Sequence, residues 1–268
     1  MKTHHLRRIR TAVFALALPA ALQAQVLING TTTYIQNFDT LPIHTQADGG
    51  GTTAFTFINN STLPGWYSSI DGTDNKAKAS IGSPSGDAIY SWGSSASTDR
   101  AFGIFSSAGF TNTEWLGLQL QNTSGTTIDT VKLTFDVEQW RRNTNHTTWA
   151  FSYLLTAESG NQLTTDGYTA DSRGNAASRS ATPTAGRSDG NNASYRRTVS
   201  VTLTGLNWQA GEYLWLRWGS DQGANAAGLG LDNFKVEATP VPEPATVALL
   251  LGLPALFFAA LLRSRLRN

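Results

Sequence analysis

The feature that most constrains the fold is a strict alternation of apolar and polar side chains between Thr130 and Gln139. Because successive residues of a strand point to opposite faces, this period of two predicts a strand with one buried and one polar face. The apolar members, which we expect in the core, are Val131, Leu133, Phe135 and Val137. The polar members, which we expect on a solvated face, are Lys132, Thr134, Asp136 and Glu138.

Strand patterns recur across the body of the chain, residues 25–238, and no long window shows the helical period of 3.6 residues. Short strands between Gly-, Asn- and Ser-rich turns predict an all-β fold, and we expect an antiparallel, jelly-roll-like β-sandwich with its first and last strands adjacent. The segments with strand character are Ile35–Phe38, Leu116–Leu120, Trp149–Leu155, Val199–Leu203, Tyr213–Trp218 and Leu229–Val236.

Residues 156–194 form a long polar stretch with few apolar anchors. We expect partial strand structure near Gln162–Tyr168 and a loose loop beyond it. Long loops in compact domains are often functional, so this stretch is of interest although its role is left open.

The first 24 residues have the pattern of a secretory signal peptide. Basic residues precede an apolar run that starts at Ala12, and a small residue, Ala24, ends the segment at the position that signal peptidase requires. A short helix removed by signal peptidase is therefore predicted for residues 1–24. The sequence has no cysteine, which excludes disulfides, thiolate metal ligands and a cysteine nucleophile.

The last segment, residues 239–268, predicts a membrane anchor. Its uncharged run at 245–262 would span roughly 27 Å as a helix, which is close to the hydrocarbon thickness of a bilayer. Residues 263–268 are basic and predict a cytoplasmic end. The charged residues that would stop the helix there are Arg263, Arg265 and Arg267. Residues 25–238 would then be an exported ectodomain.

The motif Pro242-Glu243-Pro244, followed by one apolar run and a basic end, resembles the PEP-CTERM sorting signal of Gram-negative bacteria. In that family an exosortase, a membrane protease, recognises the motif and cuts near it. The resemblance implies that Pro242, Glu243 and Pro244 are the recognised residues. It also implies an inner-membrane precursor that is delivered to the cell surface or the extracellular matrix. The alternative is a plain tail anchor behind an incidental proline-rich linker.

The body carries a second resemblance, to the β-sandwich ectodomains of secreted or surface-anchored bacterial proteins. It rests on three segments in this order: Glu138–Arg141, Gly211–Trp218 and Gly228–Phe234. Asp232-Asn233 stands where we expect Asp-Asp in that family. The resemblance implies a fold and a location but no established activity.

Asp136 and Glu138 are the candidate catalytic carboxylates, because positions two apart on a strand share a face. A carboxylate pair can hydrolyse glycosides at separations of about 5 to 9 Å. Laminarinase-like sandwich hydrolases carry Glu-x-Asp-x-x-Glu on such a strand, and Thr134 replaces the first acid here. We therefore favour a solvated outer face beside Lys132 over a hydrolase site.

Glycan binding is suggested by eight tryptophans, because sugars stack on exposed aromatic rings. Trp140 continues the polar face of the predicted strand. The four residues of the candidate glycan site are Trp140, Arg141, Asp136 and Glu138. Trp66 and Trp92 are alternatives that we expect in loops, whereas Trp215 and Trp218 are assigned to the core.

Calcium is the one cofactor with a candidate site, since the loop from Asp71 to Asn75 concentrates oxygen donors. Asp71 and Asp74 are the candidate ligands, although Asp-Gly pairs more often simply form turns.

Three functions follow from the sequence. The first is a non-catalytic surface or matrix protein, whose partners are signal peptidase, an exosortase, the membrane and an exopolysaccharide. The alternatives are a surface carbohydrate-binding module and a glycoside hydrolase. Outside its terminal segments the chain is slightly acidic, which argues against a nucleic-acid partner.

Overall fold

The computed structural model describes residues 25–30, 33–45, 50–83 and 86–241, which form sixteen strands and one 3-10 helix, η1 (Ser172–Gly174). The all-β prediction is confirmed. The predicted signal peptide and the tail from residue 242 lie outside the described residues. Within them, no helix is long and apolar enough to cross a membrane.

One sheet has seven strands, and the strand formed by the predicted segment Tyr213–Trp218 lies at its centre. Its members are β1 (Val26–Ile28), β4 (Trp66–Ser68), β8 (Glu114–Asn122), β10 (Thr148–Thr156), β11 (Thr169–Ala170), β12 (Ala176–Ala177) and β15 (Tyr213–Ser220). The order is β1–β8–β15–β10–β11, with β4 paired to β8 and β12 to β10. The central position of β15 explains why both of its faces are apolar.

The second sheet has nine strands. They are β2 (Tyr34–Gln36), β3 (Thr53–Phe57), β5 (Gly72–Ser80), β6 (Ala88–Trp92), β7 (Ala101–Phe105), β9 (Ile128–Arg142), β13 (Gly186–Arg187), β14 (Arg196–Leu203) and β16 (Gly228–Pro240). The order is β13–β9–β16–β7–β6–β5–β3, with β14 paired to β9 and β2 to β16. The alternating segment of the sequence is β9, and its four apolar residues are buried as predicted.

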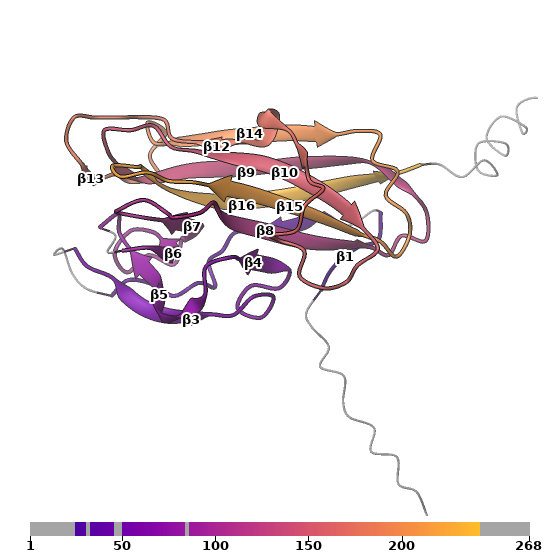
Figure 1. The fold of residues 1–268 in the computed structure, drawn as a ribbon, viewed down its shortest axis with the longest axis horizontal. Helices are drawn as coiled ribbons and strands as arrows, with labels where there is room; N and C mark the ends of the chain where they lie inside the picture. Colours follow the sequence, from indigo (N-terminus) through magenta and orange to yellow (C-terminus); the bar gives the residue numbers. More distant parts are fainter. Residues whose placement is uncertain (1–24, 31–32, 46–49, 84–85, 242–268) are drawn as a thin grey trace, which may run out of the picture.

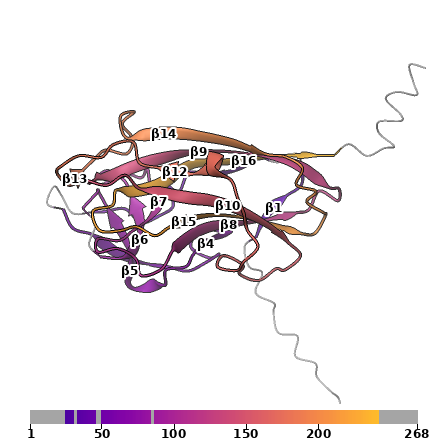
Figure 2. The same ribbon diagram turned by 45° about the horizontal axis from the view of Figure 1, so that its top comes forward.

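The two sheets lie face to face, and the long strands from β8 onward alternate between them (Figures 1 and 2). Figure 1 shows β3, β5, β6 and β7 gathered in a lobe beside these long strands. The pairing of β2 with β16 confirms that the first strand of the nine-stranded sheet lies beside the last.

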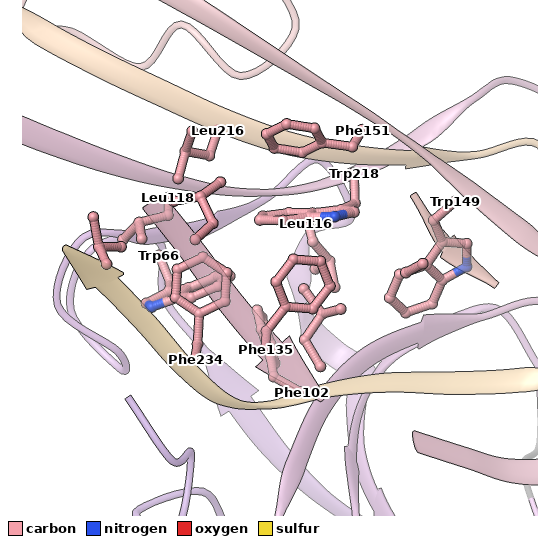
Figure 3. Packing of buried hydrophobic residues seen from close by; sticks show 14 of the residues in the cluster. Trp66, Phe102, Leu116, Leu118, Phe135, Trp149, Phe151, Leu216, Trp218 and Phe234 are labelled. Atoms are coloured by element: carbon pink, nitrogen blue, oxygen red, sulfur yellow. The ribbon is translucent and has the colours of Figure 1, made fainter. Parts of the chain in front are cut away.

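The core between the sheets is built on aromatic rings from both layers (Figure 3). Trp218 of β15 lies edge-on to Phe135 of β9, with ring centroids 5.3 Å apart. Phe151 of β10 packs on Trp218 at 5.1 Å, and Phe234 of β16 meets it edge-on at 5.6 Å. Such pairs add about 0.5–1.5 kcal/mol each beyond the burial of their surface, so they bind the layers together.

The sheets are mixed, which corrects the expectation of a purely antiparallel sandwich. β1 runs parallel to β8, and β5 runs parallel to β6, whereas the other strand pairs are antiparallel. Alternation within a strand reports which face is buried and carries no information about the direction of neighbouring strands. The sequence pattern therefore cannot distinguish parallel from antiparallel pairing.

The stretch 156–194 also departs from the prediction. No strand forms at Gln162–Tyr168, where turns surround the buried side chain of Leu163. The short strands β11, β12 and β13 and helix η1 lie farther along the chain instead. The segment is therefore fixed to the sandwich edges by β-pairing at Thr169–Ala170, Ala176–Ala177 and Gly186–Arg187.

Gly103 of β7 occupies a position where no side chain fits. An added Cβ would lie 2.1 Å from the carbonyl oxygen of Leu229. We expect Gly103→Ala to lower the free energy of unfolding by about 1–3 kcal/mol, the range for overpacked cores, in urea titrations. Gly223→Ala is the control, because its Cβ would meet nothing within 4 Å. Equal losses in both variants would contradict the steric explanation.

Candidate functional site

Trp140, the candidate glycan platform, is buried at the end of β9, with 2% of its surface exposed. It belongs to a small aromatic cluster with Tyr90, Trp92 and Phe105 on the face of the nine-stranded sheet that lies away from the core. Gly190 closes over it, since a Cβ there would lie 2.4 Å from the Trp140 Nε1 atom. The expectation of an exposed ring is therefore wrong.

The other tryptophans were only partly placed by the sequence. Trp66 and Trp92 lie in strands β4 and β6 and are fully buried, which corrects their assignment to loops. Trp215 and Trp218 are buried as predicted. Trp115 is partly exposed, and the Arg217 guanidinium lies 3.9 Å from its ring centroid. Seven of the eight tryptophans thus serve packing.

Glu138 lies beneath Trp140 and is 1% exposed, which corrects its assignment to a solvated face. Its Oε2 atom accepts a hydrogen bond of 2.9 Å from Trp140 Nε1, whereas Oε1 has no partner among the described residues. Burial, reinforced by the negative charge of Asp232, raises the pKa of Glu138 to about 8. The carboxyl group is therefore mostly protonated at neutral pH.

Asp232 of β16 is the second buried acid of this region, with 2% of its surface exposed. Burial raises its pKa to about 7, and Asp99, Asp39 and Asp136 reinforce the effect. Its Oδ2 atom accepts from Asn233 Nδ2 at 3.0 Å, and its Oδ1 atom has no partner in the described part of the chain. The sequence analysis named Asp232 only in the Asp232-Asn233 motif and did not place it near Glu138, because β16 follows β9 only after a long interval of chain.

Asp136 differs from both acids because it is partly exposed and well hydrogen-bonded. Thr198 Oγ1 and Asn233 Nδ2 both donate to its carboxylate. In the β9–β16 ladder Asp232 stands directly opposite Asp136. The two buried acids of this region are thus Glu138 and Asp232, rather than the predicted pair of Asp136 and Glu138. Both side chains are buried, so neither carboxyl group is open to a substrate.

Hollows in the described part of the surface include three that the acids Asp136, Glu138 and Asp232 do not line. The first, of about 440 Å³, lies between residues 144–148 and 220–226 and is polar, with His146 and Asp221 in its wall. The second, of about 350 Å³, is lined by residues 57–59 and 68–73. The third, of about 270 Å³, lies over Trp140 between residues 94–95 and 187–189.

The calcium candidates lie at the start of β5. Asp71 Oδ1 accepts from the backbone nitrogen and the hydroxyl of Thr73, which lowers the pKa of Asp71 and closes a turn. Asp74 lies within the strand at φ +49°. No group of three or more His, Asp or Glu residues suited to a metal occurs among the residues that the structure covers. The calcium site stays a prediction.

Pro242, Glu243, Pro244, Arg263, Arg265 and Arg267 lie outside the described residues. The chain is described up to Val241, and β16 continues to Pro240. The first residues of the predicted anchor segment, 239–268, are therefore part of a strand, because Thr239 still pairs with Thr130 of β9.

Comparison with known proteins found no matching family model and no matching curated protein. Among solved structures, the chain is similar to the K1 cleaved adhesin domain of Lys-gingipain from Porphyromonas gingivalis, with a TM-score of 0.37 and 16% identity over 76% of this chain and 97% of that one. It is also similar to the CBM22-1 xylan-binding domain of Paenibacillus barcinonensis Xyn10C, with a TM-score of 0.34 and 11% identity over 74% and 100%.

A third similar structure is the enzymatically active domain of tailspike protein 4 from bacteriophage CBA120. The TM-score is 0.33 with 11% identity, and the match covers 65% of this chain but only 19% of the tailspike. TM-scores this low assign neither a ligand nor an activity to the chain.

Proposed function

We propose that the chain is an exported, non-catalytic, jelly-roll-like β-sandwich that its C-terminal tail delivers to the surface or extracellular matrix of a Gram-negative bacterium. The signal-peptide pattern of residues 1–24 and the motif Pro242-Glu243-Pro244 support export and sorting. An exosortase would recognise the motif, and residues 245–262 would hold the precursor in the inner membrane until it is processed.

The observation that carries this proposal is that described strand structure continues to within two residues of the motif. β16 pairs with β9 as far as Pro240, and the Val241 backbone nitrogen donates to the Thr127 oxygen at 2.9 Å. Folded structure thus reaches the residue just before Pro242. The proposal places the motif between the sandwich and the predicted membrane segment, where two prolines would favour an extended backbone that a protease can bind.

The buried acids support a non-catalytic role. A glycosidase needs its two carboxyl groups to flank a substrate, and Glu138 is closed in beneath Trp140. Carbohydrate binding by stacking on Trp140 is not part of this proposal, because the same burial removes the ring from solvent.

Deletion of residues 242–268 tests the sorting role without shortening β16. We expect the deleted protein to leave the membrane and surface fractions and to appear as a soluble exported species in fractionation immunoblots. The matched control replaces Pro242, Glu243 and Pro244 with alanine while it keeps the apolar run, and it should accumulate uncut in the inner membrane. Unchanged localisation of the deleted protein would overturn the proposal.

A further inference from the structure

Strand β14 lies at an edge of the nine-stranded sheet. It pairs with β9 on one side, and no described strand pairs with its other side. Figures 1 and 2 both show β14 along the rim of the sandwich, with the other strands of its sheet on one side of it. An edge strand presents a row of unpaired backbone donors and acceptors, and a further strand can pair with them.

The alternation of hydrogen bonds along β14 identifies the backbone groups that face outward. The Gln139 nitrogen donates to the oxygen of Tyr195, the residue just before β14, at 2.9 Å. Every second residue of an antiparallel strand bonds to its neighbour, so the odd-numbered residues of β14 bond to β9. The N–H and C=O groups of Thr198, Ser200 and Thr202 therefore point away from β9. None of these backbone groups has a hydrogen-bond partner among the described residues.

β14 lacks most of the features that block exposed sheet edges. Its eight residues include no proline and no lysine, charged side chains stand only at its first two positions, and it pairs with β9 without a bulge. By contrast, β3 at the other edge of the sheet has a register shift, and β11, β12 and β13 have only two residues each. β14 is therefore open to strand addition.

Helix η1 lies near β14 but belongs to the other layer of the sandwich. The Gly174 carbonyl oxygen accepts from Trp218 Nε1 at 2.9 Å, and Asn175 Oδ1 accepts from the Phe151 nitrogen at 2.9 Å. These contacts hold η1 against β15 and β10 of the seven-stranded sheet. Arg197 Nη2 donates to the Asn175 oxygen at 2.8 Å, whereas the later residues of β14 have no hydrogen bond to this segment in the described structure.

The outward-facing part of β14 reads the same in both directions. Its sequence is Thr198-Val199-Ser200-Val201-Thr202, a palindrome centred on Ser200. A second copy that paired antiparallel about Ser200 would oppose serine to serine, valine to valine and threonine to threonine. Every outward N–H and C=O group of these residues would then be bonded, and the buried valines of both copies would continue the core face. Cross-strand pairs of threonine and of β-branched residues stabilise antiparallel sheets.

We propose that β14 pairs with β14 of a second copy of the chain and that this pairing joins copies carried on two facing surfaces. A twofold contact uses the same patch on both copies, and a palindromic strand supplies such a patch. Other registers fit less well. A slip of one residue turns the valines of one copy to the wrong face, and a slip of two opposes Thr202 to Arg196 or moves Thr198 beyond the partner strand.

The direction of the pairing is the reason for the two surfaces. β14 and β16 both pair antiparallel with β9, so they run the same way, and β16 ends at Pro240 beside the predicted tail. An antiparallel pair therefore sends its two tails in opposite directions. Ser200 pairs with Thr134 and Pro240 with Ile128, so the two chain ends lie about 40 Å apart along the strands. This step rests on the proposed export and sorting, because tails in one membrane would point the same way.

Cysteine cross-linking tests the pairing, because the natural chain contains no cysteine. In the full-length protein in non-ionic detergent, Ser200→Cys would face its own copy at a Cα separation of about 5.5 Å, which a disulfide can bridge. Thr198→Cys is the matched control, because position 198 opposes position 202 and its own copy lies about 13 Å away.

We expect mild oxidation to give about tenfold more covalent dimer from Ser200→Cys than from Thr198→Cys, measured on non-reducing gels. A mixture of Thr198→Cys and Thr202→Cys should form mixed dimers, although neither variant dimerises alone. Equal yields from Ser200→Cys and Thr198→Cys, or no dimer from Ser200→Cys, would overturn the proposed pairing.

Vesicle aggregation tests the facing surfaces. Phosphatidylcholine vesicles that carry the full-length protein should aggregate, because many weak pairs act together, and turbidity measures this. Ser200→Lys opposes like charges at the twofold axis and should reduce aggregation about fivefold. Ser194→Lys adds the same charge on the exposed loop before β14 and should leave aggregation unchanged. An unchanged midpoint of thermal unfolding shows that Ser200→Lys is folded.

The two measurements separate the parts of the proposal. Vesicles that stay dispersed although Ser200→Cys cross-links would show pairing without facing surfaces and would refute that part. Equal aggregation with Ser200→Lys and the wild type would refute a contact through β14. Cross-linking in detergent needs no membrane, and its result would not alter the fractionation of the tail deletion, so this proposal and the sorting role fail separately.

Discussion

Replacement of Glu138 with glutamine is expected to stabilise the protein at alkaline pH and to flatten the pH dependence of its unfolding free energy. Burial raises the pKa of Glu138 from its ordinary value of 4.5 to about 8 in the folded state. Between these values the unfolded chain releases a proton that the folded protein retains. Stability is therefore fully present below about pH 4.5 and falls as the pH rises to about 8.

The size of the effect follows from the same shift. Each pKa unit corresponds to about 1.4 kcal/mol, so the wild type should lose on the order of 4 kcal/mol between pH 5 and pH 8.5 through Glu138. Asp232 acts in the same direction, since its pKa is raised to about 7. Arg196, which faces Glu138 across the β9–β14 ladder, opposes the shift but is outweighed by burial.

Urea unfolding at the two pH values measures the prediction. Glu138→Gln keeps an acceptor for Trp140 Nε1 and carries no charge, so at pH 8.5 it should exceed the wild type by a few kcal/mol. Glu158→Gln, at an exposed site, serves as the control and should reproduce the wild-type pH dependence. If Glu138→Gln kept the wild-type fall in stability, Glu138 would not be the group that binds the extra proton.

Local alternation predicted the strands of the core but not what covers their outer faces. The pattern at Thr130–Gln139 predicted strand β9 and its buried residues, because the burial of one strand face is visible in the sequence of that strand alone. Whether the opposite face of the strand is covered or exposed depends on distant parts of the chain. Gly190 and the cluster around Trp92 close over Trp140, and this cover turns a predicted glycan platform into packing.

The prediction of candidate sites was limited for the same reason, because contacts between distant parts of the chain are not visible in a local pattern. A carboxylate pair two residues apart is visible in the sequence, whereas the approach of Asp232 to β9 depends on the register of β16. The edge position of β14 likewise depends on the pairing of distant strands, and the alternation within β14 does not show it.

The largest loss of stability is expected from Trp218→Ala. Trp218 is fully buried at the centre of the seven-stranded sheet, where its ring meets Phe135, Phe151 and Phe234. Its Nε1 atom donates to the Gly174 carbonyl oxygen at 2.9 Å, which ties η1 to the sandwich. Truncation of a buried tryptophan costs about 3–5 kcal/mol, and the orphaned carbonyl adds about 1 kcal/mol or more.

A total loss near 5 kcal/mol is comparable to the whole stability of many domains, so we expect Trp218→Ala to be partly or fully unfolded at 37 °C. Trp218→Phe keeps a ring between the sheets and should lose clearly less. The matched control is Trp115→Ala, whose ring is partly exposed on the neighbouring strand β8 and should cost below about 2 kcal/mol. Urea unfolding at low temperature compares the three variants. The ring of Trp218 contacts aromatic residues of both sheets, whereas the ring of Trp115 lies against Arg217 of its own sheet. Similar losses of stability in Trp115→Ala and Trp218→Ala would therefore contradict a core centred on Trp218.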